Sequence, residues 1–273
     1  MSRMENQALT ALVESSEAAG YTLPPELLDA YRTYRRVREV KADIPAPLDV
    51  DTVAARIVSA VAAGEDPGPL DAARNLDETT AARATAESAQ RILGRATEQA
   101  AEAATNLAAD LAERIITEHL RPAFEQVHDE AREVAAALDG YGLDAHTLIK
   151  APAKARNAFL RLPELVNRKA AILDARKRVN AIGHRTPEHD AQGLFATFRE
   201  PMRFFPTWRH PARIPMLPFP EDATERLLWI VGPEAKAAEP WLPTVAEQDA
   251  AWLAQFEANM PKSAPWARLV ANA

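Results

Sequence analysis

The chain has 273 residues, an apolar fraction of 47% and a net charge of −7, so it can build a core, and wholesale disorder is excluded. It contains no cysteine, which excludes disulfides, thiolate metal sites and a cysteine nucleophile. The N-terminus lacks an apolar leader, and no run approaches the ~18 apolar residues of a membrane span. We therefore expect no membrane partner, and a location in the cytoplasm or within a particle assembled inside the cell.

Charge is distributed unevenly along the chain. Residues 1–149 carry 14 basic and 26 acidic side chains, residues 150–213 carry 14 and 5, and residues 214–273 carry 4 and 8. A basic segment between two acidic ones indicates charge pairing within or between chains. Binding of the segment 150–213 to nucleic acid is the alternative interpretation.

The first 69 residues predict short helices. A helix over residues 5–19 ends at Gly20, because glycine readily takes the positive φ of a helix C-terminus. Pro24 and Pro25 open a second helix that runs to about residue 41, since proline is tolerated in the first turn. A third helix follows Asp49 or Asp51 and contains Val53, Ile57, Val58 and Val61.

An unusually long helical segment follows. From Asp71 to about Leu120 there is no proline, one glycine and abundant alanine, which favours a helix of ~75 Å. The pattern continues to about residue 139, with a kink or break expected at Pro122. The apolar seam consists of Leu93, Ala100 and Leu107, followed by Ile116, Leu120, Phe124, Val127, Ala131, Val134 and Leu138. Alanine buries little area, so this seam requires a close partner helix, from the same chain or another copy.

The next segment predicts an antiparallel basic return. Gly140 and Gly142 permit a reversal, and helices follow over residues 153–162 and 164–182, divided by Pro163 and ending at Gly183. Arg161 and Arg168 lie on the same helical side as Leu165. Either the stems of these arginines lie along the edge of a narrow contact, or this side meets acidic groups.

The C-terminal third is rich in proline. Residues 199–220 hold a proline every two to five positions, which predicts an extended arm, and their large apolar side chains predict that the arm lies against something. Residues 227–231 predict one short strand, and residues 244–259 a last helix. The expected fold is thus mainly α, an elongated helical bundle or coiled coil with three regions: 1–69, 70–183 and 184–273.

No linear catalytic motif is present, so we expect neither an enzyme nor a bound cofactor or metal. Glu125 and His128 form one ExxH pair, whereas a di-iron bundle needs two such pairs, so a solvated helix face is favoured. A cluster of His184, His189 and Asp190 could hold zinc, but an ordinary polar turn is favoured. His119 has no evident partner in the sequence.

The arm offers the best candidate partner-binding residues. They are Arg199, Arg203, Phe204, Phe205, Trp208, Arg209, Arg213 and Phe219. Guanidinium groups neutralise phosphates and aromatic rings stack on bases, but the same groups can pack on the chain itself or on another copy. We expect a non-enzymatic structural or assembly protein, a component of a viral particle or similar large assembly, which contacts its own copies or another protein.

Overall fold

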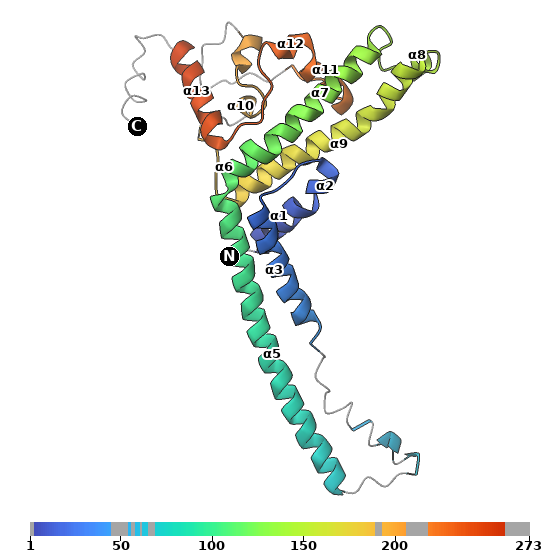
Figure 1. The fold of residues 1–273 in the computed structure, drawn as a ribbon, viewed down its shortest axis with the longest axis vertical. Helices are drawn as coiled ribbons and strands as arrows, with labels where there is room; N and C mark the ends of the chain where they lie inside the picture. The colour runs from blue at the N-terminus through green and yellow to red at the C-terminus, as the bar shows by residue number, and fades with distance from the viewer. Residues whose placement is uncertain are drawn as a thin grey trace. The chain divides into compact units, whose positions relative to one another are not determined.

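The computed structural model describes residues 3–44, 54–55, 58–60, 62–64, 69–188, 193–205 and 218–259. These residues are mainly helical, and the one β-bridge among them joins Phe198 to Pro240, so the mainly α prediction is confirmed (Figure 1). The helices are α1 (Arg3–Glu14), α2 (Ser16–Ala19), α3 (Pro25–Ala42), α5 (Pro69–Asp110), α6 (Ala112–Arg114), η1 (Ile115–Leu120), α7 (Arg121–Leu138), α8 (Ala145–Ile149), α9 (Ala153–Ile182), α10 (Leu194–Thr197), η2 (Pro201–Phe204), α11 (Ala223–Val231), α12 (Pro233–Lys236) and α13 (Val245–Asn259). No helix among the described residues is both long and apolar enough to cross a membrane.

The chain divides into two compact units, one of residues 26–104 and one of residues 1–25 with 105–273. In the first unit, the side chain of Lys41 at the end of α3 reaches the middle of α5, where its Nζ is 3.6 Å from the position that a Cβ on Gly94 would take. The expected second helix is confirmed as α3. Most of the expected third helix, with Val53, Ile57 and Val61, lies outside the described residues.

The second unit is built on an antiparallel hairpin of α7 and α9, connected through Gly140 and Gly142 with φ of 80° and 64°. Its core contains the predicted apolar positions from Ile116 to Leu138 of the long segment, all at most 5% exposed. Helices α1 and α2 pack on α9, and α11 packs on both α7 and α9. The expected end of the first helical region at Gly20 is confirmed, with φ of 74°.

The disruption expected at Pro122 is confirmed, and it takes the form of the π-helical turn η1. The Arg121 N–H donates to the Ile116 carbonyl five residues earlier, and Pro122 follows in the first turn of α7. Proline lacks an N–H and crowds the carbonyl of the preceding turn, so a widened turn directly before it relieves both problems.

The predicted division at Pro163 is wrong. Helix α9 runs without interruption from Ala153 to Ile182, with Pro163 on its exposed side. Leu162 and Leu165, on either side of the proline, are each 1% exposed. Burial of these side chains in a helix packed on α7 outweighs the loss of one backbone hydrogen bond.

The strand predicted at residues 227–231 is also wrong, because these residues belong to helix α11. The Asp222 carboxylate accepts hydrogen bonds from the N–H groups of Thr224 and Glu225 at 2.8 and 2.9 Å, which starts the helix. Leu227, Ile230 and Val231 then fall on one helical side and are buried. A short apolar run is equally consistent with a strand and with a buried helix, and the Asp222 cap selects the helix here.

The expected arm is extended only in part. Of residues 199–220 the structure describes 199–205 and 218–220, and within them Pro201–Phe204 forms one turn of 3-10 helix. Proline fixes φ near the helical value and needs no N–H at the start of a helical turn, so it begins this turn rather than preventing it. The last helix, predicted over 244–259, is confirmed as α13.

Replacement of Pro163 by alanine is expected to raise the free energy of unfolding by about 1–3 kcal/mol, because it restores a donor inside α9. Urea unfolding followed by circular dichroism measures the change. Pro152→Ala is the control, because Pro152 lies at the N-cap of the same helix, where no intrahelical donor is missing. Equal effects of the two substitutions would contradict the interpretation.

Candidate partner-binding groove

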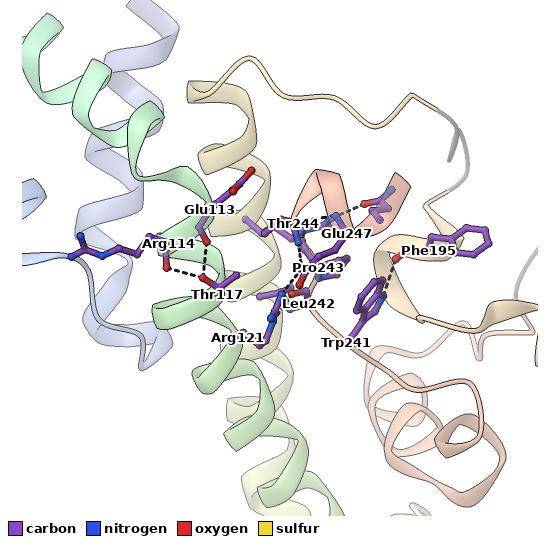
Figure 2. Close-up of polar contacts among 12 residues, drawn as sticks. Glu113, Arg114, Thr117, Arg121, Phe195, Trp241, Leu242, Pro243, Thr244 and Glu247 are labelled. Atoms are coloured by element: carbon purple, nitrogen blue, oxygen red, sulfur yellow. Dashed lines mark hydrogen bonds and ion pairs between the residues drawn. The ribbon is translucent and has the colours of Figure 1, made fainter. Parts of the chain in front are cut away.

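Two arginines of the hairpin hold the chain that leads into α13. Arg121, from α7, donates to the Leu242 carbonyl at 3.1 Å and to the Glu247 carboxylate at 2.5 Å (Figure 2). Arg176, from α9, donates to the Pro243 carbonyl at 2.7 Å and to the side-chain oxygen of Gln248 at 2.6 Å. Residues 242 and 243 are thus fixed to both helices of the hairpin.

The start of α13 is fixed by a reciprocal cap. The Glu247 carboxylate accepts from the Thr244 N–H at 2.8 Å, and the Thr244 hydroxyl accepts from the Glu247 N–H at 3.2 Å. This is a capping box of the T-x-x-E type, which satisfies two donors at a helix start. The same carboxylate binds Arg121, so it connects the helix start to α7 (Figure 2).

The segment before α13 is held by a short antiparallel pairing. The Trp241 N–H donates to the Thr197 carbonyl at 3.1 Å, and the Arg199 N–H donates to the Glu239 carbonyl at 3.0 Å. The Trp241 indole N–H donates to the Phe195 carbonyl at 2.8 Å, so the ring is fixed in direction (Figure 2). The guanidinium of Arg199 lies over this ring, 4.8 Å from its centroid.

An open groove of about 650 Å³ lies beside this ring. Ala250, Ala251 and Ala254 of α13 line it on one side, and Trp241 and Met202 also face it. Its charged lining residues are Arg199, Glu200, Arg203 and Glu247. Most of the exposed area of the groove is apolar, and the side chains that line it along the helix are small.

The structure divides the predicted binding residues into three groups. Arg199 and Arg203 line the groove. Phe204 and Phe219 pack on the buried cluster of Phe198, Ile230, Ala235 and Ala238, and Phe205 packs on the cluster of Leu194, Phe195 and Met202. For these three aromatic residues, packing on the chain itself is the arrangement observed. Trp208, Arg209 and Arg213 lie outside the described residues.

Sequence reasoning missed Trp241, Met202 and the alanines of α13. The motif Thr244-Val-Ala-Glu247 could have placed the start of α13, because it has the spacing of a capping box. No comparable signal marks Trp241, whose role depends on the pairing with residues 197–199, more than 40 positions earlier.

The arginine side of helix α9 meets acidic groups, which was one of the two interpretations of that side. Arg161 and Arg168 both pair with Glu130, at 2.9 and 3.0 Å. Burial favours a raised pKa for Glu130, but the hydrogen bond and charge of Arg168, with further hydrogen bonds from Gln126 and Arg161, lower it below the usual range. Arg185 likewise pairs with Glu113 at 2.5 Å. These pairs occupy cations that nucleic acid would otherwise use.

For His128, the prediction that the ExxH pair lies on a solvated helix face is wrong. Glu125 is exposed, but His128 is 2% exposed and its ring packs against Phe124 with centroids 4.0 Å apart. Burial, followed by the charges of Lys169 and Arg132, lowers the pKa of His128 to about 3. The imidazole is therefore neutral throughout the physiological range.

The other histidines give no metal site within the described part of the chain. No group of three or more His, Asp or Glu residues there is placed to hold a metal ion. His184 is described, whereas His189 and Asp190 lie outside the described residues. The His119 Nδ1, for which the sequence offered no partner, lies 2.8 Å from the hydroxyl of Thr22.

Arg176→Met is expected to lower the free energy of unfolding by about 2–4 kcal/mol, because it leaves a buried carbonyl and a buried amide without their charged donor. Lys177→Met is the control, since that lysine is 79% exposed and forms only a surface ion pair with Asp174. Limited proteolysis within residues 242–248 should become faster in Arg176→Met alone. Equal stability of the two variants would show that the arginine does not hold this segment.

The His128 ring predicts a loss of stability in acid. Its pKa is about 3 in the folded chain, against an ordinary value of 6.5, so the unfolded chain binds a proton first as the pH falls below ~6.5. Between pH 7.5 and 5.5 this group alone should lower the free energy of unfolding by about 1.4 kcal/mol. His128→Leu should remove that part of the pH dependence in urea titrations at the two pH values, and an unchanged dependence would exclude His128 as its source.

Comparison of the chain with protein-family models, curated proteins and solved structures finds no match. The function is therefore inferred from the geometry of the groove and of the helices around it.

Proposed function

We propose that the chain is a non-enzymatic assembly protein that acts through protein–protein contacts, and that its groove holds an apolar segment of a partner protein. The observation that carries this proposal is the composition of the groove: a fixed Trp241 ring and Met202 beside a helix surface of alanines. Fixed aromatic side chains are the usual anchors of protein interfaces, because they bury a large area and lose little conformational entropy on binding.

The polar groups of the groove favour binding over catalysis. The described lining residues include no histidine, serine, threonine, tyrosine or lysine. Glu247 is held by Arg121 and by the cap of α13, and Glu200 pairs with Arg203. Neither carboxylate is therefore available as a general base without the loss of its ion pair.

The charged groups at the groove indicate which charge a partner segment would carry next to its apolar residue. The side chains of Arg199 and Arg203 are 56% and 64% exposed, and each forms a surface ion pair. Such pairs contribute little, so a carboxylate of a partner can replace the glutamate at a small cost. We therefore propose a partner segment with one large apolar residue next to an aspartate or glutamate.

The long helix supports the proposed role in assembly. Between Thr80 and Ala100 no residue of α5 is buried, and Ile92 is 68% exposed. A helix with this much open surface is typical of an elongated bundle or coiled coil completed by another chain. A viral particle or similar large assembly is the setting that we propose for such contacts.

Peptide display tests the groove directly. Selection on the full chain should enrich peptides with an apolar residue next to Asp or Glu. Ala254→Trp should weaken their binding at least tenfold, because the bulky ring fills the groove from an exposed position on α13. Ala246→Trp is the matched control, since Ala246 is exposed on the same helix but does not line the groove.

Two results would contradict the proposal. Peptides that bind Ala254→Trp as tightly as the unchanged chain would place the binding elsewhere. A single-stranded oligonucleotide that binds the chain with an affinity falling steeply with salt, while no peptide is enriched, would favour the nucleic-acid alternative for residues 150–213.

A further inference from the structure

Helix α5 carries a charged stripe with an internal order. Arg91, Arg95, Glu98 and Glu102 follow at spacings of four, three and four residues, so they form one row along the helix. All four are exposed, and within the described part of the chain none of them lies in an ion pair. Arg91 instead donates to the Ser88 hydroxyl at 3.4 Å. The stripe thus presents two unpaired cations followed by two unpaired anions.

An apolar side chain and a shallow groove lie beside this stripe. Ile92, 68% exposed, lines an open groove of about 560 Å³ with Ser88, Arg91, Arg95, Ala96 and Gln99. Lys41, at the end of α3, approaches Gly94 about 200° around the helix from Ile92, and it lines a second groove with Glu87, Gln90 and Arg91, so α3 borders the stripe on the side away from Ile92. The surface around Ile92 is therefore open along about three turns.

We infer that this surface of α5 binds the same surface of a second copy in antiparallel orientation. A two-fold axis between Ala96 and Thr97 places Arg91 opposite Glu102 of the second copy and Arg95 opposite Glu98. Both pairs then occur twice, because the contact is the same from either side. Antiparallel pairing is selected because a parallel pair would place like charges opposite each other.

The inference rests on the proposed function, since it names one of the partners through which the chain would assemble. It concerns residues 88–102, whereas the peptide-binding experiment concerns Ala254 and the groove beside Trp241. Loss of one contact would leave the other measurable, so the two proposals fail separately.

Engineered cysteines test the orientation, because the natural chain contains none. Glu98→Cys should give a disulfide-linked dimer of the full chain under mild oxidation, since residue 98 lies in the stripe and the antiparallel arrangement separates its two copies by only about 5 Å along the helix. Ser88→Cys, from the groove beside the stripe, should not, because the antiparallel arrangement separates the two copies of residue 88 by about 25 Å along the helix. Equal cross-linking of both would indicate parallel pairing, and no cross-linking beyond that of Ser88→Cys would exclude the contact.

Charge reversal tests the chemistry. The full chain should give twice its 29.9 kDa by light scattering, and R91E/R95E and E98R/E102R should each raise the dissociation constant of the dimer at least tenfold. Mixed in equal amounts, the two variants should restore the dimer, because one stripe is then entirely acidic and the other entirely basic. Circular dichroism is the control, and both variants should remain as helical as the unchanged chain. A monomeric unchanged chain, or dimers unaffected by both reversals, would overturn the inference.

Discussion

Two arginines, Arg121 and Arg176, provide the interaction on which the candidate groove depends. They come from the two helices of the hairpin, and they bind the consecutive carbonyls of Leu242 and Pro243 together with the first turn of α13. Arg176 is 8% exposed, so its charge is removed from water and must be satisfied by these acceptors. The position of α13, and with it the alanine surface of the groove, follows from that requirement.

The same logic applies to three arginines in the basic middle of the chain. Glu130 alone binds two arginines of α9, and Glu113 binds Arg185. The hairpin brings the acidic residues of α7 next to the basic residues of α9, so charges that are separated in the sequence are neutralised in the fold. At the groove, a fixed aromatic ring and two exposed arginines remain.

Helix α5 differs from the hairpin in how its charged side chains are paired. Its row of arginines and glutamates has no ion-pair partner within the described residues, and Ile92 beside it is exposed. Between Thr80 and Ala100 no residue of this long helix is buried, so that part depends on packing against a partner for most of its stability. The antiparallel contact that we propose would use the order of charges along this row.

The sequence by itself determined the mainly helical class, several of the helix ends and the reversal of the chain. Helix breaks and caps depend on the local sequence. The structure therefore has them where the residues alone predicted, at Gly20, Pro25, Pro122 and the glycines at 140 and 142. Local rules failed where burial competed with them. Pro163 ends a helix in isolation, but the packing of Leu162 and Leu165 keeps α9 continuous.

Tertiary structure alone decided the candidate site. Arg199 and Arg203 could be selected from the sequence because they are charged and lie among aromatic residues. Whether an aromatic residue lines the groove or packs on a buried cluster could not be predicted, because Phe204 and Trp241 are both partly buried and their contacts come from other segments of the chain. Trp241 lies beside Arg199 because a backbone pairing joins segments 40 residues apart, and no periodicity within either segment encodes that distance.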